Sequence, residues 1–529
     1  MKKELQHEAT SPSTRRRGEG ADGLRQGAYR CAMIVAGGIL LSTVPVPAAV
    51  AADLGGNCCA DLEERIAELE ATTVRKGNRR VSLTLSGQVS RSVMYWNDGF
   101  DHDVYSVDNG LTSSRFRFVG SAKINADLTA GFLYEMDIRI GSRSNQVTQI
   151  DDDGFSGAGG ILGAPALGDG IGGQGDSVLG IRTANWYVDS KHWGRLTVGR
   201  LAAASDGIST INLSNMIVVV NSEPGEYQSA FLMRNGIGRL GIGSSWATQC
   251  GGPTTAAPAV TPAVRSPGAG AYSSDCFEHG PVRRDGVRYD TPTWHGFSFS
   301  TAWGEDDYWD AAVRYAGEWH GFRVAAGAGY RVYRDREPDF LLTAPAFGPP
   351  DRQLADTDRR HFLTSASIMH IASGLFLSAA YTRYEFRGTA ENELFFGTDD
   401  NRPDIPLWWV AGGIQRNWHT WGATTFYAEY GKFYDGTVGL SADVAYGNLG
   451  PNAGKFNVDP NNPNVFVADS EVSWWGLGAV QTIDAAAMDL YIAYRNYSAD
   501  ARMSGGFGNQ IPGGLEDIWF IQAGARIQF

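Results

Sequence analysis

The chain ends on the stretch DIWFIQAGARIQF, residues 517–529, and this stretch alternates with a period of two. Apolar residues fall on every second position from Trp519 to Phe529, and the positions between them are mostly polar or small, including Gln522, Arg526 and Gln528. This pattern predicts a β-strand with one apolar and one polar face that runs to the carboxyl terminus. Because chain ends fray unless they are paired, we expect this strand to lie within a sheet.

The same alternation begins at RVSLTLSGQVS, residues 80–90, where Val and Leu alternate with Ser, Thr and Gln. It returns in residues 116–124, 132–138 and 322–332. A buried core on the serine side would leave hydroxyl groups without hydrogen-bond partners. Lipid on the apolar face and water on the polar face satisfy both sides, so the pattern favours a membrane barrel over a soluble sandwich.

Sixteen such segments can be counted, an even number, as a closed single-chain barrel requires. They start near residues 81, 113, 128, 178, 194, 286, 295, 309, 321, 359, 374, 405, 420, 470, 487 and 516. Short turns alternate with long connections, the arrangement of barrels with short periplasmic turns and long outer loops. The predicted fold is therefore all-β, a transmembrane antiparallel barrel of about 16 strands preceded by a short helical segment.

Composition and charge agree with this class. The 67 Gly, 24 Phe, 21 Tyr and 15 Trp favour β-structure with tight turns. Residues 1–51 contain seven of the 45 Lys/Arg and four of the 58 Asp/Glu, which leaves 38 basic and 54 acidic residues from 52 onward, a net charge of −16. A surface this acidic argues against nucleic acid as a partner.

The amino-terminal region predicts export. Arg25 and Arg30 precede a short apolar run at 31–44, and Ala49-Val50-Ala51 offers a small-residue cleavage site, so residues 1–51 read as a signal peptide with an extended start. Residues 52–79 carry apolar positions at helical spacing. They predict a periplasmic segment that either forms a coiled coil between subunits or lies on its own domain. The barrel itself is expected over 80–529.

Four of the short turns place a tryptophan beside a histidine: Trp193, Trp294, Trp319 and Trp418. Amphipathic rings favour the level of the lipid headgroups, so these residues are expected to belong to an aromatic girdle. The neighbouring histidines are then interface residues and not catalytic ones.

RVSLTLSGQVSR, SRFRFVGSAKINADLTAGFLYEMDI, GRLTVGR, RRDGVRYDTPTWHGFSFSTAWGEDDYWDAAVRYAG and the terminal ARIQF resemble the trimeric porins of alphaproteobacterial outer membranes. The resemblance covers roughly residues 58–529. It implies a sixteen-stranded barrel, a homotrimer, and passive diffusion of small hydrophilic solutes and ions. It also implies that the terminal Phe529 is read by the barrel-assembly machinery, and that the loop after the fifth strand folds into the pore.

That loop corresponds to residues 202–285, which are longer than the family's constriction loop. Cys250 and Cys276 flank a Pro/Ala/Gly-rich run within it, and in an exported protein they are expected to form a disulfide. Whether this insert lies in the pore, over its mouth or outside stays open.

Strand parity and the resemblance together nominate the residues that line the pore. The wall candidates are Arg115, Arg117, Arg182, Arg200 and Arg288, and the loop candidates are Asp206, Glu223 and Glu226. Parity also places Glu135 and Asp137 on the water side. Opposed charges of this kind would orient dipolar solutes, with a weak ion selectivity of either sign. The alternative is that these charges only solvate a wide lumen.

No nucleophile–base pair or metal-ligand spacing stands out, so neither an enzyme nor a cofactor is expected. Asp151, Asp152 and Asp153 form a weak Ca²⁺ candidate in a loop that also reads as a solvated acidic turn. Cys58 and Cys59 could link subunits or pair elsewhere. Three functions compete with a general porin in the outer membrane: a substrate-specific channel for sugars or acids, an outer-membrane barrel enzyme, and a secreted structural protein.

Overall fold

The computed structural model describes most of the expected barrel. It covers residues 81–138, 179–222, 283–305, 307–335, 357–387, 403–436, 467–503 and 514–529, with parts of 143–149 and 231–245. The expected signal peptide, the helical segment 52–79 and Cys58 and Cys59 lie outside these ranges. Within them, no helix combines the length and the apolar character needed to cross a membrane.

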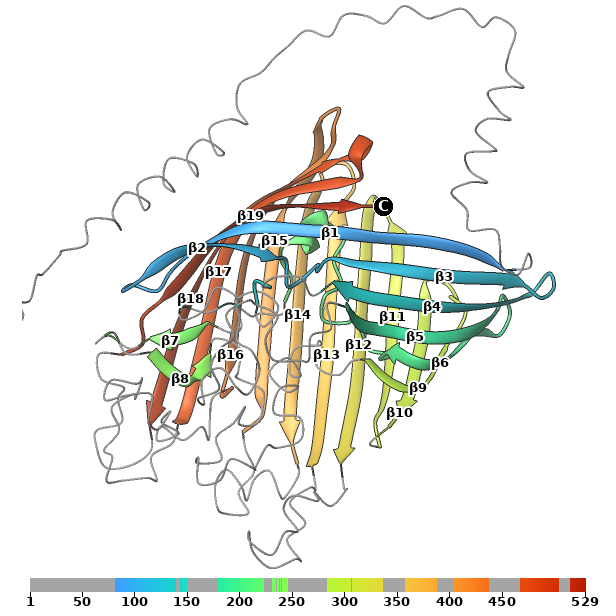
Figure 1. Ribbon diagram of the computed structural model, residues 1–529, viewed down its shortest axis with the longest axis horizontal. Coiled ribbons are helices and arrows are strands. Elements are labelled where there is room, and N and C mark those ends of the chain that lie inside the picture. Colours follow the sequence, from blue (N-terminus) through green and yellow to red (C-terminus); the bar gives the residue numbers. More distant parts are fainter. Residues whose placement is uncertain are drawn as a thin grey trace, which may run out of the picture. The chain divides into compact units, whose positions relative to one another are not determined.

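Seventeen strands form one antiparallel sheet, and the ribbon shows most of them running side by side (Figure 1). They are β1 (Ser82–Asn97), β2 (His102–Asp108), β3 (Arg115–Lys123), β4 (Leu128–Ile138), β5 (Leu179–Ser190), β6 (Gly194–Ala202), β9 (Arg283–Asp290), β10 (Phe297–Gly304), β11 (Trp309–Trp319), β12 (Phe322–Asp335), β13 (Thr357–His370), β14 (Leu375–Phe386), β15 (Ile405–His419), β16 (Gly422–Tyr434), β17 (Val467–Ile483), β18 (Met488–Met503) and β19 (Ile518–Gln528). A separate hairpin consists of β7 (Leu232–Arg234) and β8 (Leu240–Ser245), and short 3-10 turns occur at η1 (Asn215–Val218) and η3 (Asp484–Ala486).

The sheet closes on itself through its first and last strands. β19 pairs antiparallel with β1 from Gln88↔Gln528 to Asn97↔Trp519, and Figure 1 shows the two ribbons together. The other edge of β1 pairs with β3 over Ser82–Gln88 and with β2 over Arg91–Asn97. Since β2 and β3 share one position, the seventeen strands make sixteen positions around a closed barrel. The predicted all-β barrel is confirmed.

β2 was not predicted, because the sequence assigns residues 97–112 to a long connection. β1 is 16 residues long, whereas β3 reaches only its first half. The second half of β1 would present an unpaired edge, which is costly in a membrane. β2 occupies that edge and pairs with Arg91–Asn97.

Each strand turns one face outward and one inward, as the alternation predicts. On β1 the apolar residues Leu83, Leu85 and Val93 are exposed, whereas Ser90 and Ser92 are buried. Directly paired residues share a face, so this parity carries from strand to strand around the barrel.

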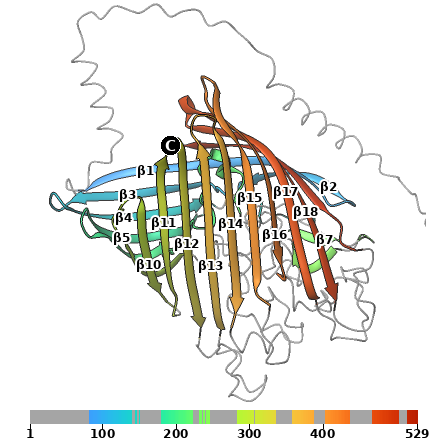
Figure 2. The ribbon, with the colours of Figure 1, turned by 180° about the vertical axis from the view of Figure 1, so that it is seen from behind.

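The inner face of β14–β19 departs from the expected polar lining. Its inward positions carry large buried rings on strands that Figure 2 shows from behind: Tyr384, Trp409, Phe433, Trp474 and Phe520. These rings belong to one apolar cluster that also contains Val218, Val219 and Val220 from the segment after β6. This half of the interior is therefore packed with protein.

Candidate functional site

Residues 203–222, here called the inner segment, leave β6 and attach to the inner face of β11 and β13. The backbone N and the Oγ of Ser205 donate to Asp310 Oδ2 at 2.6 and 2.7 Å. Arg314 Nη2 donates to the backbone oxygens of Ala204 and Asp206 at 2.7 and 2.6 Å. Further along, Ser365 Oγ on β13 donates to the Ile208 carbonyl. These contacts hold the first half of the segment against the wall.

The second half of the inner segment reaches strands on another part of the wall. Asn215 Nδ2 donates to Thr482 Oγ1 on β17 at 2.6 Å and to Asp489 Oδ1 on β18 at 2.7 Å. The Val218 carbonyl accepts from Asn109 Nδ2 at 3.0 Å. β11 and β18 are seven strands apart in the order of the sheet, so the segment crosses the interior of the barrel.

Apolar packing fixes the second half as well. Met216, Val218, Val219 and Val220 are buried in the cluster on the inner face of β14–β19. Burial of aliphatic side chains contributes about 1.5–3 kcal/mol each. The inner segment is thus held by hydrogen bonds at both ends, and at its second end by apolar contacts as well.

Three of the predicted wall arginines converge on one carboxylate of β4. Arg182 Nε lies 2.8 Å from Glu135 Oε1, Arg117 Nε lies 2.9 Å from Oε2, and Arg115 Nη1 lies 3.6 Å from Oε1. We call these four residues the basic cluster. The structure brings Arg115, Arg117 and Arg182 together, with Glu135 at the centre.

Arg182 reaches this position through a β-bulge. The pairing of β4 with β5 shifts between Glu135 and Met136, so that Glu135 opposes Thr183 and Met136 opposes Ile181. Arg182 is the extra residue and turns inward. This irregularity explains why simple alternation gives no clear side for it.

The arginine side chains of the basic cluster are more exposed than its carboxylate. The Arg117 side chain is 46% exposed and the Arg115 side chain 21%, whereas Glu135 is only 5% exposed. Next to it Asp137 pairs with Arg143 and lies 3.9 Å from Arg182 Nη1. The carboxylates therefore sit behind the guanidinium groups, and the surface presented to the interior is positive.

The remaining predicted charges lie apart from the cluster. Arg288 forms hydrogen bonds to Asp290 at 2.7–3.0 Å and donates to the Ala203 carbonyl at 2.7 Å, so it supports the start of the inner segment. Asp206 lies on the inner segment, and no ion pair among the described residues joins it to the cluster. Glu223, Glu226, Cys250 and Cys276 lie outside the described residues.

Arg200 does not lie where the sequence analysis places it. The pairings of β6 with β5 and β9 run through Gly199 without a shift, so Arg200 shares its face with Leu196 and Val198. Leu196 is exposed on the outward side. Arg200 therefore faces outward, opposite Asp285. The prediction that Arg200 lines the wall of the pore is wrong.

The four tryptophans of the short turns are all exposed at one end of the barrel strands: Trp193, Trp294, Trp319 and Trp418. In two of these turns the following histidine and glycine have positive φ, 47° and 86° at His295 and Gly296. Two successive positive φ values are the geometry of the tight turns that suit twisted hairpins. At these two turns the tryptophan itself belongs to the last pair of the hairpin, Trp294 with Phe297 and Trp319 with Phe322.

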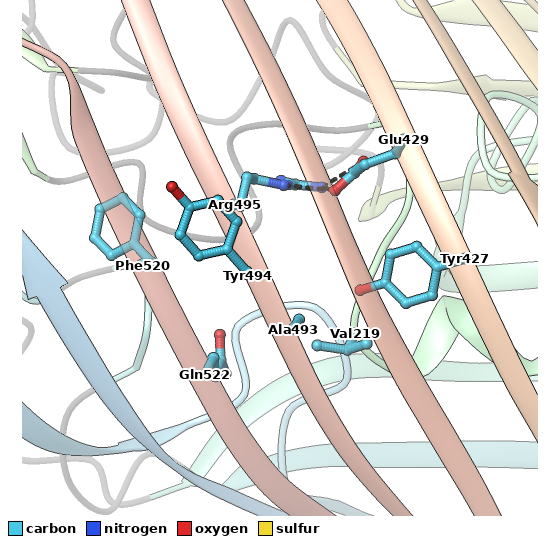
Figure 3. Close-up of a pocket in the computed structure, with 8 residues that line it drawn as sticks. All are labelled: Val219, Tyr427, Glu429, Ala493, Tyr494, Arg495, Phe520 and Gln522. Atoms are coloured by element: carbon cyan, nitrogen blue, oxygen red, sulfur yellow. Dashed lines mark hydrogen bonds and ion pairs between the residues drawn. The ribbon is translucent and has the colours of Figure 1, made fainter.

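A small pocket borders Val219 on the inner face of β16, β18 and β19 (Figure 3). Within it Glu429 accepts from Arg495 Nε and Nη2 at 2.8 and 2.9 Å, and from Trp409 Nε1 at 2.7 Å. Both charges of this pair are buried and satisfied. Among the described residues no three His, Cys, Asp or Glu gather as metal ligands, and Asp151–Asp153 lie outside these residues.

Sequence reasoning missed the residues that hold the inner segment. Ser205, Asp310 and Asn215 carry no motif, and their partners lie 105 or more residues away in the chain. Strand parity places Glu135 on the water side of its strand. Parity does not show which arginines surround it.

Comparison with known proteins gives one family. A family model described as Gram-negative porin matches residues 46–502. No curated protein matches the chain significantly. Similar solved structures include an anion-selective porin from Comamonas acidovorans (14% identity, TM-score 0.45, covering 85% of this chain and 100% of that one), OprB of Pseudomonas putida (10%, 0.45, 89% and 97%) and OmpF of Salmonella typhi in complex with daunomycin (13%, 0.41, 84% and 97%).

Proposed function

Since the chain belongs to the Gram-negative porin family, we propose that it is a channel for the passive diffusion of small hydrophilic solutes and ions across the outer membrane. The inner segment is the observation that carries this proposal. It crosses the interior and is fixed at both ends, to β11 and β13 on one side and to β17 and β18 on the other. A segment that is fixed at both ends narrows the passage through the barrel and does not open and close like a lid.

The open path is then expected beside the basic cluster. The inner face of β14–β19 is filled by buried rings and by the valines of the inner segment. The water-exposed guanidinium of Arg117 lies on β3, on the part of the wall that this packing does not occupy. The pore constriction is proposed to lie between the basic cluster and residues 203–214.

A substrate-specific channel is the second candidate, and an aromatic slide along the lumen would favour it. The large inward rings on β14–β19 are buried and present no such surface to solutes. Among the described residues this argues for a general channel. An outer-membrane enzyme would need a reactive constellation, and the family and fold are those of a channel.

The assembly is proposed to be a homotrimer in outer-membrane lipid, grouped with the alphaproteobacterial porins that its strand motifs resemble. Insertion is proposed to need the barrel-assembly machinery. Recording single channels from purified full-length protein in planar bilayers tests the function. An open trimer is expected to give large conductance steps in multiples of three. Folded protein that never conducts would contradict the proposed channel function.

Selectivity is proposed to be weakly anionic, because the guanidinium groups of the basic cluster face the lumen and the carboxylates lie behind them. Replacing Arg115 and Arg117 by Glu together should shift the reversal potential in a salt gradient toward cations. Replacement of both by Gln should give a smaller shift of the same sign. These changes are measured in planar bilayers.

The control for this pair is Arg323→Glu, which changes the same charge on β12 next to a short turn, where Arg323 pairs with Glu318 at 2.8 Å. It should leave the reversal potential close to that of the wild type. An unchanged potential in the double Glu variant, with normal folding, would remove the cluster from the selectivity mechanism.

A further inference from the structure

The closing seam, where β1 pairs with β19, has its outer end at the pair Asn97↔Trp519. Beyond this pair the two strands separate. β1 turns into β2 through residues 98–101, and the chain enters β19 from residues 514–517. The last pairs of a ladder open most easily, because they have neighbours on one side only. The outer end of the seam therefore needs a further contact to stay closed.

The β7–β8 hairpin, green in Figure 1, supplies contacts at this end although it comes from the middle of the chain, between β6 and β9. Glu516 N donates to the Arg234 carbonyl at 2.8 Å. Gly236 N donates to the Gly514 carbonyl at 3.0 Å. Residues 514 and 516 lead into β19, so the backbone of the hairpin pairs with this chain where β1 has already turned away.

A buried ion pair attaches the same hairpin to the other strand of the seam. Arg234 Nε donates to Asp98 Oδ2 at 2.7 Å, and Asp98 directly follows the last residue of β1. The two side chains are 12% and 2% exposed. Asp98 Oδ1 accepts from the backbone N of Asp101 at 2.8 Å, which fixes the carboxylate within the β1–β2 turn. Arg234 thus contacts both strands of the seam, one through its backbone and one through its side chain.

Phe231 makes a third contact, on the inner face of the seam. It precedes β7 and is fully buried. The centroid of its ring lies 5.5 Å from that of Trp96 on β1 and 4.9 Å from that of Phe520 on β19, both in edge-on geometry. Trp96 and Phe520 are directly paired across the seam. One ring therefore packs against both members of the last inward pair, and such aromatic contacts add to the free energy of burial.

We propose that Phe231, Arg234 and Gly236 form a seam staple, a strap that holds the outer end of the barrel's closing seam shut. The full set of contacts exists only while β1 and β19 lie side by side, so the staple favours the closed seam over an opened one. An opened seam would leave backbone groups of both strands without partners in the membrane. The staple acts on barrel closure and does not depend on a conducting channel, so it goes beyond the proposed diffusion function.

The test is hydrogen exchange of the full-length, folded protein, read by mass spectrometry and compared between the wild type and Arg234→Gln. Loss of one partner leaves the buried Asp98 carboxylate without its cation. Backbone amides at 518–521 should exchange about tenfold faster, as expected when a charge-assisted hydrogen bond is lost. Amides at 525–528, at the opposite end of the seam, should exchange as in the wild type. Arg234→Lys keeps a cation at this position and should give an intermediate rate.

Arg502→Gln is the matched control, because Arg502 pairs with Asp469 at 3.2 Å at the same end of the barrel but both side chains are more than half exposed. It should leave exchange at 518–521 unchanged. If Arg234→Gln yields no folded barrel, Phe231→Leu replaces it, since leucine keeps an apolar side chain and removes the ring contacts. Unchanged exchange at 518–521 in the folded variant would overturn the proposal. Exchange that rises equally at both ends of the seam would also overturn it, because that result indicates a general loss of stability.

Discussion

Deleting Phe529 is expected to lower the amount of assembled, heat-modifiable barrel about tenfold or more, while total synthesis stays unchanged. Phe529 completes the seam with β1: its N donates to the Gly87 carbonyl at 3.1 Å, and its carbonyl accepts from Gly87 N at 2.9 Å. Buried backbone groups that lose a partner cost about 1–3 kcal/mol each. Gel migration of membrane fractions before and after heating measures the assembled fraction.

The side chain of Phe529 contributes separately. Its ring covers Gly87, where an added Cβ would lie 2.6 Å from Phe529 Cζ. An aromatic ring over a strand glycine protects the exposed backbone. Phe529→Ala keeps the backbone pairing and should show an intermediate loss, and Phe529→Tyr should assemble normally. Wild-type assembly of the deletion would refute the role of the seam.

Asp310→Ala should release the start of the inner segment, giving a larger and noisier open-channel current and a lower temperature of heat modification. Asp310 Oδ2 accepts both donors of Ser205, and hydrogen bonds to a charged group contribute about 1.5–3 kcal/mol each. Fully buried Arg331, directly paired with Asp310, donates from Nε to Ser205 Oγ at 3.0 Å. The substitution also removes the carboxylate opposite that buried charge.

Glu318→Gln is the control for this change, because Glu318 lies on the same strand and its pair with Arg323 is exposed. It should leave both current and heat modification as in the wild type. Asp310→Asn retains one acceptor and should fall between the two. A quiet, unenlarged current in folded Asp310→Ala protein would show that Asp310 does not hold the inner segment.

Much of the fold could be predicted because its signal is local and repeated. Each strand must satisfy lipid on one side, so apolar residues recur with period two, and sixteen repeats with alternating connection lengths indicate a closed barrel. The sequence places residues 102–108 in a long connection, whereas in the structure they form β2. Its place follows from the unpaired half of β1, which is a property of the assembled sheet and not of residues 102–108.

Within the site, Arg115, Arg117 and Arg182 lie together as nominated, although alternation alone gives no clear side for Arg182, and the wall placement of Arg200 is wrong. A single bulge turns Arg182 inward, and the unbroken registers beside Gly199 leave Arg200 outward. A bulge such as the one at Arg182 depends on how the neighbouring strand pairs. A sequence pattern averaged over several residues does not contain that information.

The amino-acid sequence by itself determined the barrel, its outward apolar face and its closing seam at DIWFIQAGARIQF, because bilayer and water impose the same two-sided demand on every strand. Only the tertiary structure decided the path of the inner segment and the burial of Glu135 behind its arginines. Those features rest on single contacts such as Ser205 with Asp310, between residues far apart in the chain, and such contacts leave no periodic trace in the sequence.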